Sequence, residues 1–107
     1  MYTPVTMTTH NFHIPAGDKR KIYVAENECV SVELPPALED SESITIYNKT
    51  VANKVLVYYM SDEIKNDVAE LYVDANLTFY PNALDSAWEI IEGTGVPYSK
   101  MIGAALN

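Results

Sequence analysis

The stretch Val30-Ser31-Val32-Glu33-Leu34 alternates apolar and polar side chains, and Pro35-Pro36 follows it directly. Strict alternation is typical of a β-strand with one buried face, because successive side chains of a strand point to opposite sides. The two prolines end this strand, since proline has no backbone N–H to donate to a neighbouring strand. This segment predicts a protein built from short, half-buried strands.

Similar runs lie on both sides of this strand. Before it, Lys21–Ala25 places Ile22 and Val24 on one face, which we expect to point inward. Further strand-like runs come after it: Ser43–Tyr47, Val55–Met60, Leu71–Val73, Leu77–Tyr80, Trp88–Ile91 and Val96–Ile102. Pro97 makes the last of these runs an edge strand. The spacing predicts an all-β fold, an antiparallel β-sandwich or jelly-roll-like barrel of about eight short strands.

The segment from Ser61 to Ala75 fits two structures. Ile64, Val68, Leu71 and Ala75 have helical spacing, which would make an amphipathic helix capped by Ser61 or Asp62. The alternation in Leu71–Val73 and Leu77–Tyr80 instead favours a loop to about Asp67, followed by a hairpin. We favour the loop and hairpin.

The first residues differ from the rest of the chain. Thr3–Thr9 contains four threonines and no charged residue. We therefore predict two parts, an extended N-terminal arm of residues 1–14 and a β-sandwich domain of residues 15–107. The arm is either free or added to the sheet edge of a neighbouring subunit, and deleting residues 1–9 should leave the fold intact.

Composition excludes several classes of function. The 107 residues include 7 basic and 15 acidic side chains, for a net charge of −8. This charge argues against nucleic-acid binding, because no basic surface is available for phosphates. No apolar run is long enough to cross a membrane, and the start lacks the pattern of a secretory signal.

The residues with catalytic or metal-binding chemistry are few and scattered. His10 and His13 are the only histidines, and Cys29 is the only cysteine, placed in a regular strand. Nucleophilic catalysis needs a base beside its nucleophile, and a zinc site needs more ligands than this pair. The acidic residues of the loops suit solvent or, less well, calcium. We predict a protein that is not an enzyme and that binds no metal or cofactor.

Tyrosine is the unusual feature of the composition, with eight residues. Five of them lie in predicted strands: Tyr23, Tyr47, Tyr58, Tyr72 and Tyr80. Most of these five are on the face opposite the aliphatic residues that we expect to point inward. A half-exposed row of tyrosines is a good platform for a protein or a sugar. A carbohydrate-binding module is therefore the alternative function.

The order of strands resembles that of small virion proteins of tailed phages. The residues that carry the resemblance are Ser43-Ile44-Thr45-Ile46-Tyr47-Asn48, Val55-Leu56-Val57-Tyr58-Tyr59, Leu77-Thr78-Phe79-Tyr80 and Ala87-Trp88-Glu89-Ile90-Ile91 before Gly93-Thr94-Gly95. The similarity covers about residues 15–103 and is one of layout, without a diagnostic motif. It implies an accessory protein of the capsid, of the decoration, cement or knob type, located in the virion.

The resemblance also implies the partners. They are the major capsid protein or another virion protein, and further copies of the chain in a trimer or dimer. We expect the contacts to lie on the arm and on the strand that is apolar on both faces: Tyr2, Val5, Met7, Val55, Val57, Tyr58 and Tyr59.

Overall fold

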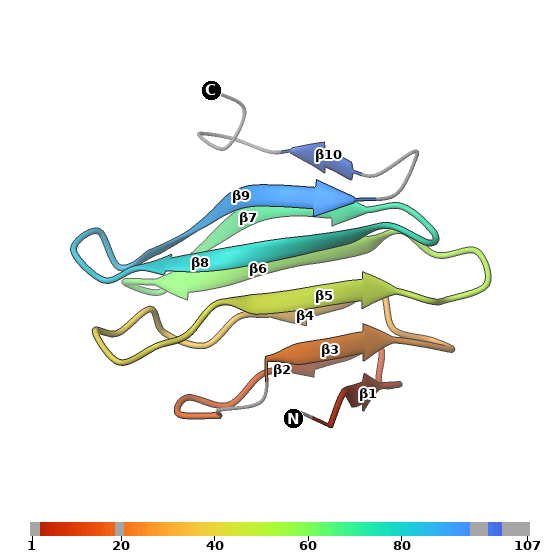
Figure 1. Ribbon diagram of the computed structural model, residues 1–107, viewed down its shortest axis with the longest axis horizontal. Helices are drawn as coiled ribbons and strands as arrows, with labels where there is room; N and C mark the ends of the chain where they lie inside the picture. The colour runs from red at the N-terminus through yellow and green to blue at the C-terminus, as the bar shows by residue number, and fades with distance from the viewer. Residues whose placement is uncertain (1–2, 19–20, 95–98, 102–107) are drawn as a thin grey trace.

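The structure is a computed structural model that describes residues 3–18, 21–94 and 99–101. These residues form ten β-strands and no helix (Figure 1). The first six strands are β1 (Val5–Met7), β2 (Asn11–His13), β3 (Ile22–Ala25), β4 (Ser31–Glu33), β5 (Ile44–Asn48) and β6 (Val55–Ser61). The last four are β7 (Ile64–Leu71), β8 (Asn76–Asn82), β9 (Ala87–Thr94) and β10 (Ser99–Met101). The predicted all-β class is confirmed.

The strands build two sheets of five that lie one behind the other (Figure 1). Sheet A has the order β1-β3-β5-β8-β9, and sheet B has the order β10-β7-β6-β4-β2. The two sheets form a sandwich, because their inner faces enclose one hydrophobic core. Neither sheet closes on itself, so the fold is not a barrel.

The first six strands alternate between the sheets. As a result β1, β3 and β5 are parallel neighbours in sheet A, and β2, β4 and β6 are parallel neighbours in sheet B. The later strands pair antiparallel, as β5 with β8, β8 with β9, β6 with β7, and β7 with β10. The prediction of an antiparallel sandwich is therefore wrong for the first half, which also lacks the antiparallel connections of a jelly roll.

The segment from Ser61 to Ala75 forms neither a helix nor a loop with a hairpin. Ile64–Leu71 is a strand that forms a hairpin with β6 through a two-residue turn at Asp62 and Glu63. The chain then leaves sheet B, and Asn76–Asn82 enters sheet A. Leu71 and Leu77 are thus on strands of different sheets, and the turn at Asp74 connects two layers.

Residues 5–14 belong to the sandwich, so the prediction of a separate arm is wrong. β1 pairs with β3 and β2 pairs with β4, both within the same chain. Met7 and Ile14 are completely buried. The arm is ordered because each strand extends a sheet and each brings an apolar side chain to the core.

One strand presents the opposite face from the one expected. Tyr23 and Ala25 point into the core, and Ile22 and Val24 point outward. The Tyr23 ring meets Phe12 from the other sheet, with a centroid distance of 6.3 Å. Both faces of this strand are apolar, and the larger Tyr23 side chain fills the space between the sheets. Trp88 also points inward and is 4% exposed.

Candidate binding surfaces

The predicted interface strand β6 lies in the middle of sheet B, between β4 and β7. Val55 and Val57 are completely buried, and Tyr59 packs against the core. Val55 and Val57 lie between the two sheets and are not accessible to a partner, and Tyr59 is partly buried. The apolar character of this strand on both faces reflects its central position.

Tyr58 points to the outer side of sheet B but is only 7% exposed. Its hydroxyl group accepts a hydrogen bond from the amide of Asn11 at 3.1 Å and lies 3.3 Å from the carboxylate of Glu33. The ammonium group of Lys65 lies over its ring, 4.8 Å from the centroid. Tyr58 therefore links three strands of its own sheet and offers little surface to a partner.

The tyrosines do not form a common platform. Tyr23 is in the core, Tyr58 is covered, and Tyr72 lies in a turn. Tyr47 and Tyr80 remain half-buried on the outer side of sheet A, but Tyr47 is opposite Asn76, which is four residues from Tyr80 along β8. The two rings are therefore near opposite ends of the sheet. The row that suggested a sugar-binding module is absent from the described residues.

The outer side of sheet A is uncharged over four of its five strands. We call this the uncharged face, and its outward residues are Thr6, Ile22, Val24, Thr45, Tyr47, Asn76, Thr78 and Tyr80. The strands lie side by side in front in Figure 1. Charge reappears at its borders, at the exposed Glu89 of the edge strand β9 and at Lys49 just after β5.

An apolar hollow occupies one end of the uncharged face. Pro4, Ile22, Val24, Tyr47 and Lys49 line a space of about 290 Å³. Next to it, the hydroxyl groups of Thr45 and Thr78 form a hydrogen bond of 3.0 Å across β5 and β8. One of these hydroxyl groups donates to the other, so the two threonines pair within the face.

The outer side of sheet B has the opposite character. It carries Glu33, Lys65, Asp67 and Glu70 on two strands, β4 and β7. Lys65 and Asp67 form an ion pair of 3.7 Å, and His13 lies 3.6 Å from Glu33. The two outer surfaces of one sandwich therefore differ in charge, although the strands of both come from the same acidic chain.

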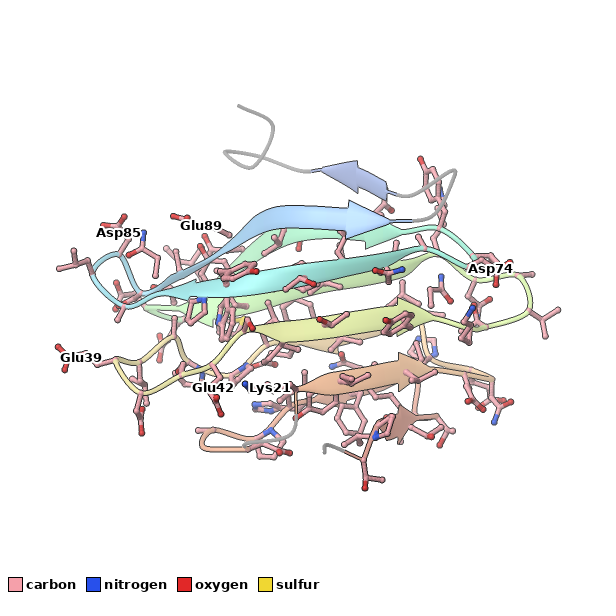
Figure 2. All side chains as sticks on the ribbon, in the orientation of Figure 1. Lys21, Glu39, Glu42, Asp74, Asp85 and Glu89 are labelled. Carbon is pink, nitrogen blue, oxygen red and sulfur yellow. The ribbon has the colours of Figure 1, made fainter. Side chains whose placement is uncertain are left out.

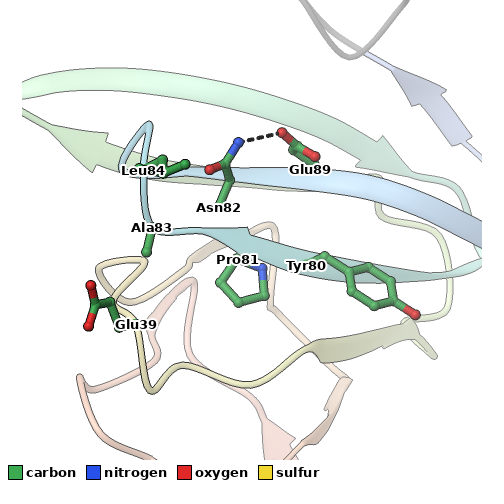
Figure 3. Close-up of a pocket in the computed structure, with 7 residues that line it drawn as sticks. All are labelled: Glu39, Tyr80, Pro81, Asn82, Ala83, Leu84 and Glu89. Carbon is green, nitrogen blue, oxygen red and sulfur yellow. Dashed lines mark hydrogen bonds between the residues drawn. The ribbon is translucent and has the colours of Figure 1, made fainter.

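Another hollow lies at the end of the sandwich, beside the turn between β8 and β9. Its volume is about 570 Å³, and Figure 3 shows the residues that line it: Glu39, Tyr80, Pro81, Asn82, Ala83, Leu84 and Glu89. The Asn82 amide donates hydrogen bonds to Asp85 at 3.0 Å and to Glu89 at 2.8 Å. Both amide hydrogens are thus used inside the turn.

Several carboxylates gather at this end of the molecule. Glu39, Glu42, Asp85 and Glu89 appear together in Figure 2, and the nearby Lys21 pairs with Glu42 at 3.0 Å. No histidine, cysteine or lysine lies among the residues of the larger hollow. The polar side chains that line it are two carboxylates, one amide and one phenol.

The other residues with reactive chemistry are separated from one another. Cys29 is completely buried, and burial raises the pKa of its thiol. His10 and His13 are both exposed, and His13 faces Glu33. Within residues 3–18, 21–94 and 99–101, no group of three or more histidine, cysteine or acidic side chains could hold a metal ion.

Of the remaining predicted contact residues, Tyr2 lies outside the described residues, Val5 is partly buried at an edge strand, and Met7 is in the core. The surface that sequence reasoning missed is the uncharged face. Its signal was present in the alternating runs Lys21–Ala25 and Ser43–Tyr47, which have apolar or hydroxyl side chains on both faces. The alternation alone did not show which of the two faces is outside.

Comparisons with protein-family models, with curated proteins and with solved structures each find no match. In the described part of the chain, no helix has the length and apolar character needed to span a membrane.

Proposed function

We propose that the protein is a non-enzymatic structural component of a phage virion, which binds the major capsid protein or another virion protein through its uncharged face. The observation that carries this proposal is the charge difference between the two outer surfaces of the sandwich. The chain has 22 charged residues, from 7 basic and 15 acidic side chains, yet none lies on the outward positions of β1, β3, β5 or β8.

Depletion of charged residues is what distinguishes the centre of a protein interface from the rest of a surface. Ile22, Val24 and Tyr47 supply the apolar centre, and Thr6, Thr45 and Thr78 surround it with hydroxyl groups. A small contact of this kind is weak alone. It becomes stable on a shell, because many identical sites are presented at once to linked copies.

The proposal that the protein belongs to a virion rests on the resemblance of its strand layout to that of small virion proteins of tailed phages. Its four segments coincide with real strands, since Ile44–Asn48, Val55–Ser61, Asn76–Asn82 and Ala87–Thr94 are β5, β6, β8 and β9. A decorating protein needs a stable body with one adhesive surface and no reactive groups. The described surfaces fit that requirement, with an uncharged face on one side and a charged face on the other.

The test is co-sedimentation with purified shells of the encoding phage that were assembled without this protein. We compare the wild-type chain, Val24→Lys on the uncharged face and Leu56→Lys on the outer side of sheet B. Both replaced side chains are half-buried on an outer surface, so the variants are matched. We expect the wild-type chain and Leu56→Lys to sediment with the shells and Val24→Lys to remain in solution.

Two outcomes would contradict the proposal in different ways. If the wild-type chain does not bind, the virion function is wrong. If Val24→Lys binds as well as the wild-type chain, the protein binds shells through a different surface. Circular dichroism of each variant checks that the strands are retained.

A further inference from the structure

Both sheets of the sandwich end on the same side, at the first two strands of the chain, which have three residues each. β1 is the edge of sheet A, and β2 is the edge of sheet B. Figure 1 shows both strands at the bottom of the view, with β2 behind β3 and to the left of β1. We call this side the double edge. Each of its strands pairs on one side only and offers unpaired backbone groups on the other.

The double edge lacks one usual protection of an edge strand, which is charged side chains. Residues 3–14 contain no aspartate, glutamate, lysine or arginine, in a chain in which 21% of residues are charged. The opposite edge differs, because its strand β9 carries the exposed Glu89. Charges on edge strands prevent pairing with other chains, so their absence marks the double edge as the side that is open to it.

The core is also incompletely covered there. Val5 of β1 and Phe12 of β2 point inward and pack against the buried cluster, but both remain partly exposed. They form an apolar seam between the two edge strands. Any partner that pairs with both strands would also cover this seam and remove apolar surface from water.

We propose that the double edge binds the double edge of a second copy of this chain, in a two-fold symmetric dimer. A single extended segment of another protein could pair with β1 or with β2, but it would leave the other edge unpaired. A second copy presents two strands with the spacing of the same sandwich. In a two-fold symmetric dimer of this kind, β1 would pair antiparallel with β1 of the second copy and β2 with β2, which would extend both sheets.

The charge distribution of the chain agrees with a second copy as the partner at the double edge. Each copy has a net charge of −8, and two such chains repel at most surfaces. At the double edge neither copy brings a charged side chain from residues 3–14. The dimer also places two uncharged faces side by side, because β1 is the edge of that face. The inference concerns the chain alone and does not depend on the proposed binding to a shell.

The first test is the mass of the full chain in a dilution series, measured by light scattering after size exclusion. We expect the wild-type protein to run at twice its monomer mass of 11.9 kDa and to dissociate on dilution. Thr6→Lys adds a charge to an exposed position of β1 and should raise the dissociation constant about tenfold or more. Leu84→Lys adds the same charge in the turn between β8 and β9, where the side chain is 97% exposed, and should leave the dimer unchanged.

A second measurement locates the contact. Amide hydrogen exchange in Val5–Met7 and Asn11–His13 should slow as the protein concentration rises, and exchange in the edge strand β9 should not change. A wild-type monomer at every concentration, a trimer, or a dimer that persists in Thr6→Lys would overturn the proposal. Protection of β9 in place of β1 and β2 would also overturn it.

Discussion

The side-chain amide of Asn48 donates a hydrogen bond of 2.9 Å to the backbone carbonyl of Leu71. Asn48 is the last residue of β5 in sheet A, and Leu71 is the last residue of β7 in sheet B, so this bond connects the two layers. The same amide donates to the carbonyl of Asn53 at 2.8 Å, and its oxygen accepts from the Thr50 hydroxyl at 2.7 Å. Asn48 thus fixes the crossing between the sheets at the end of the sandwich.

Removing this side chain should destabilise the protein strongly. Asn48 is completely buried, so Asn48→Ala leaves the Leu71 carbonyl and the Thr50 hydroxyl without this partner. Unsatisfied buried polar groups are costly, and we expect a loss of about 3 kcal/mol in the free energy of unfolding. Urea denaturation measures it, with the emission of the single, buried Trp88 as the signal. Asn66→Ala is the control, because it removes a solvent-exposed hydrogen bond from the Asn66 amide to the Ile64 carbonyl. It should lower the free energy of unfolding by less than about 1 kcal/mol. Equal losses in both would show that the Asn48 network is not a tie between the layers.

Much of the fold follows from the alternation of side chains. The alternating runs predicted strands at β3, β4, β5, β6, β8 and β9, and all of them are present. The first half of β7 was missed, because Ile64–Asp67 is a polar part of the hairpin that extends away from the core and is exposed for most of its length. A strand without a buried face leaves no periodic apolar signal.

Strand direction and the location of the binding surface could not be predicted in this way. Alternation has the same period in parallel and antiparallel sheets, so the parallel pairing of β1, β3 and β5 left no trace in the pattern. Val55 and Val57 are not exposed at an interface, because a strand that is apolar on both faces is more often a central strand than an exposed one. The uncharged face became visible only when Tyr23 was found inside and Val24 outside.

The N-terminal segment contributes to stability, in contrast to the expectation for a removable arm. Met7 is completely buried in the core cluster, next to the exposed Thr6 on the same strand. Met7→Ala should lower the free energy of unfolding by about 3 kcal/mol, because it deletes buried apolar atoms and leaves a cavity. Thr6→Ala is the matched control and should change stability by less than about 0.5 kcal/mol. Thermal unfolding of the two variants distinguishes a core strand from a loosely attached one, for which Met7→Ala would have no effect.

The turn between β6 and β7 contains removable backbone strain. Asp62 and Glu63 have φ angles of 52° and 64°, and their neighbours Ser61 and Ile64 are paired, which is the geometry of a two-residue hairpin turn. Glycine adopts positive φ without the steric cost of a side chain. Glu63→Gly should therefore stabilise the protein by about 0.5–1 kcal/mol in urea denaturation. Glu70→Gly, within the same strand β7, should have the opposite sign, since glycine weakens a strand interior. Destabilisation by both variants would contradict a strained turn.

The buried thiol of Cys29 makes the free energy of unfolding depend on pH in the alkaline range. Burial raises the pKa of Cys29 above its ordinary value of 9.0, and the bond from its sulfur to the carbonyl of Ser31 does not reverse this direction. Between the unfolded and folded pKa values the unfolded chain has lost the thiol proton and the folded chain has kept it, so stability falls as pH rises through this window.

Cys29→Ala removes this group and its pH dependence. The difference in unfolding free energy between the wild-type protein and the variant should be largest near pH 8 and should shrink toward pH 10, by up to about 1.4 kcal/mol per pH unit. All other ionisable groups are shared by both proteins and cancel in the difference. The native thiol should also resist alkylation at pH 8 and react after unfolding in urea, since the thiolate is the reactive form. A difference that stays constant with pH, together with rapid alkylation of the folded protein, would show that Cys29 is open to solvent in solution.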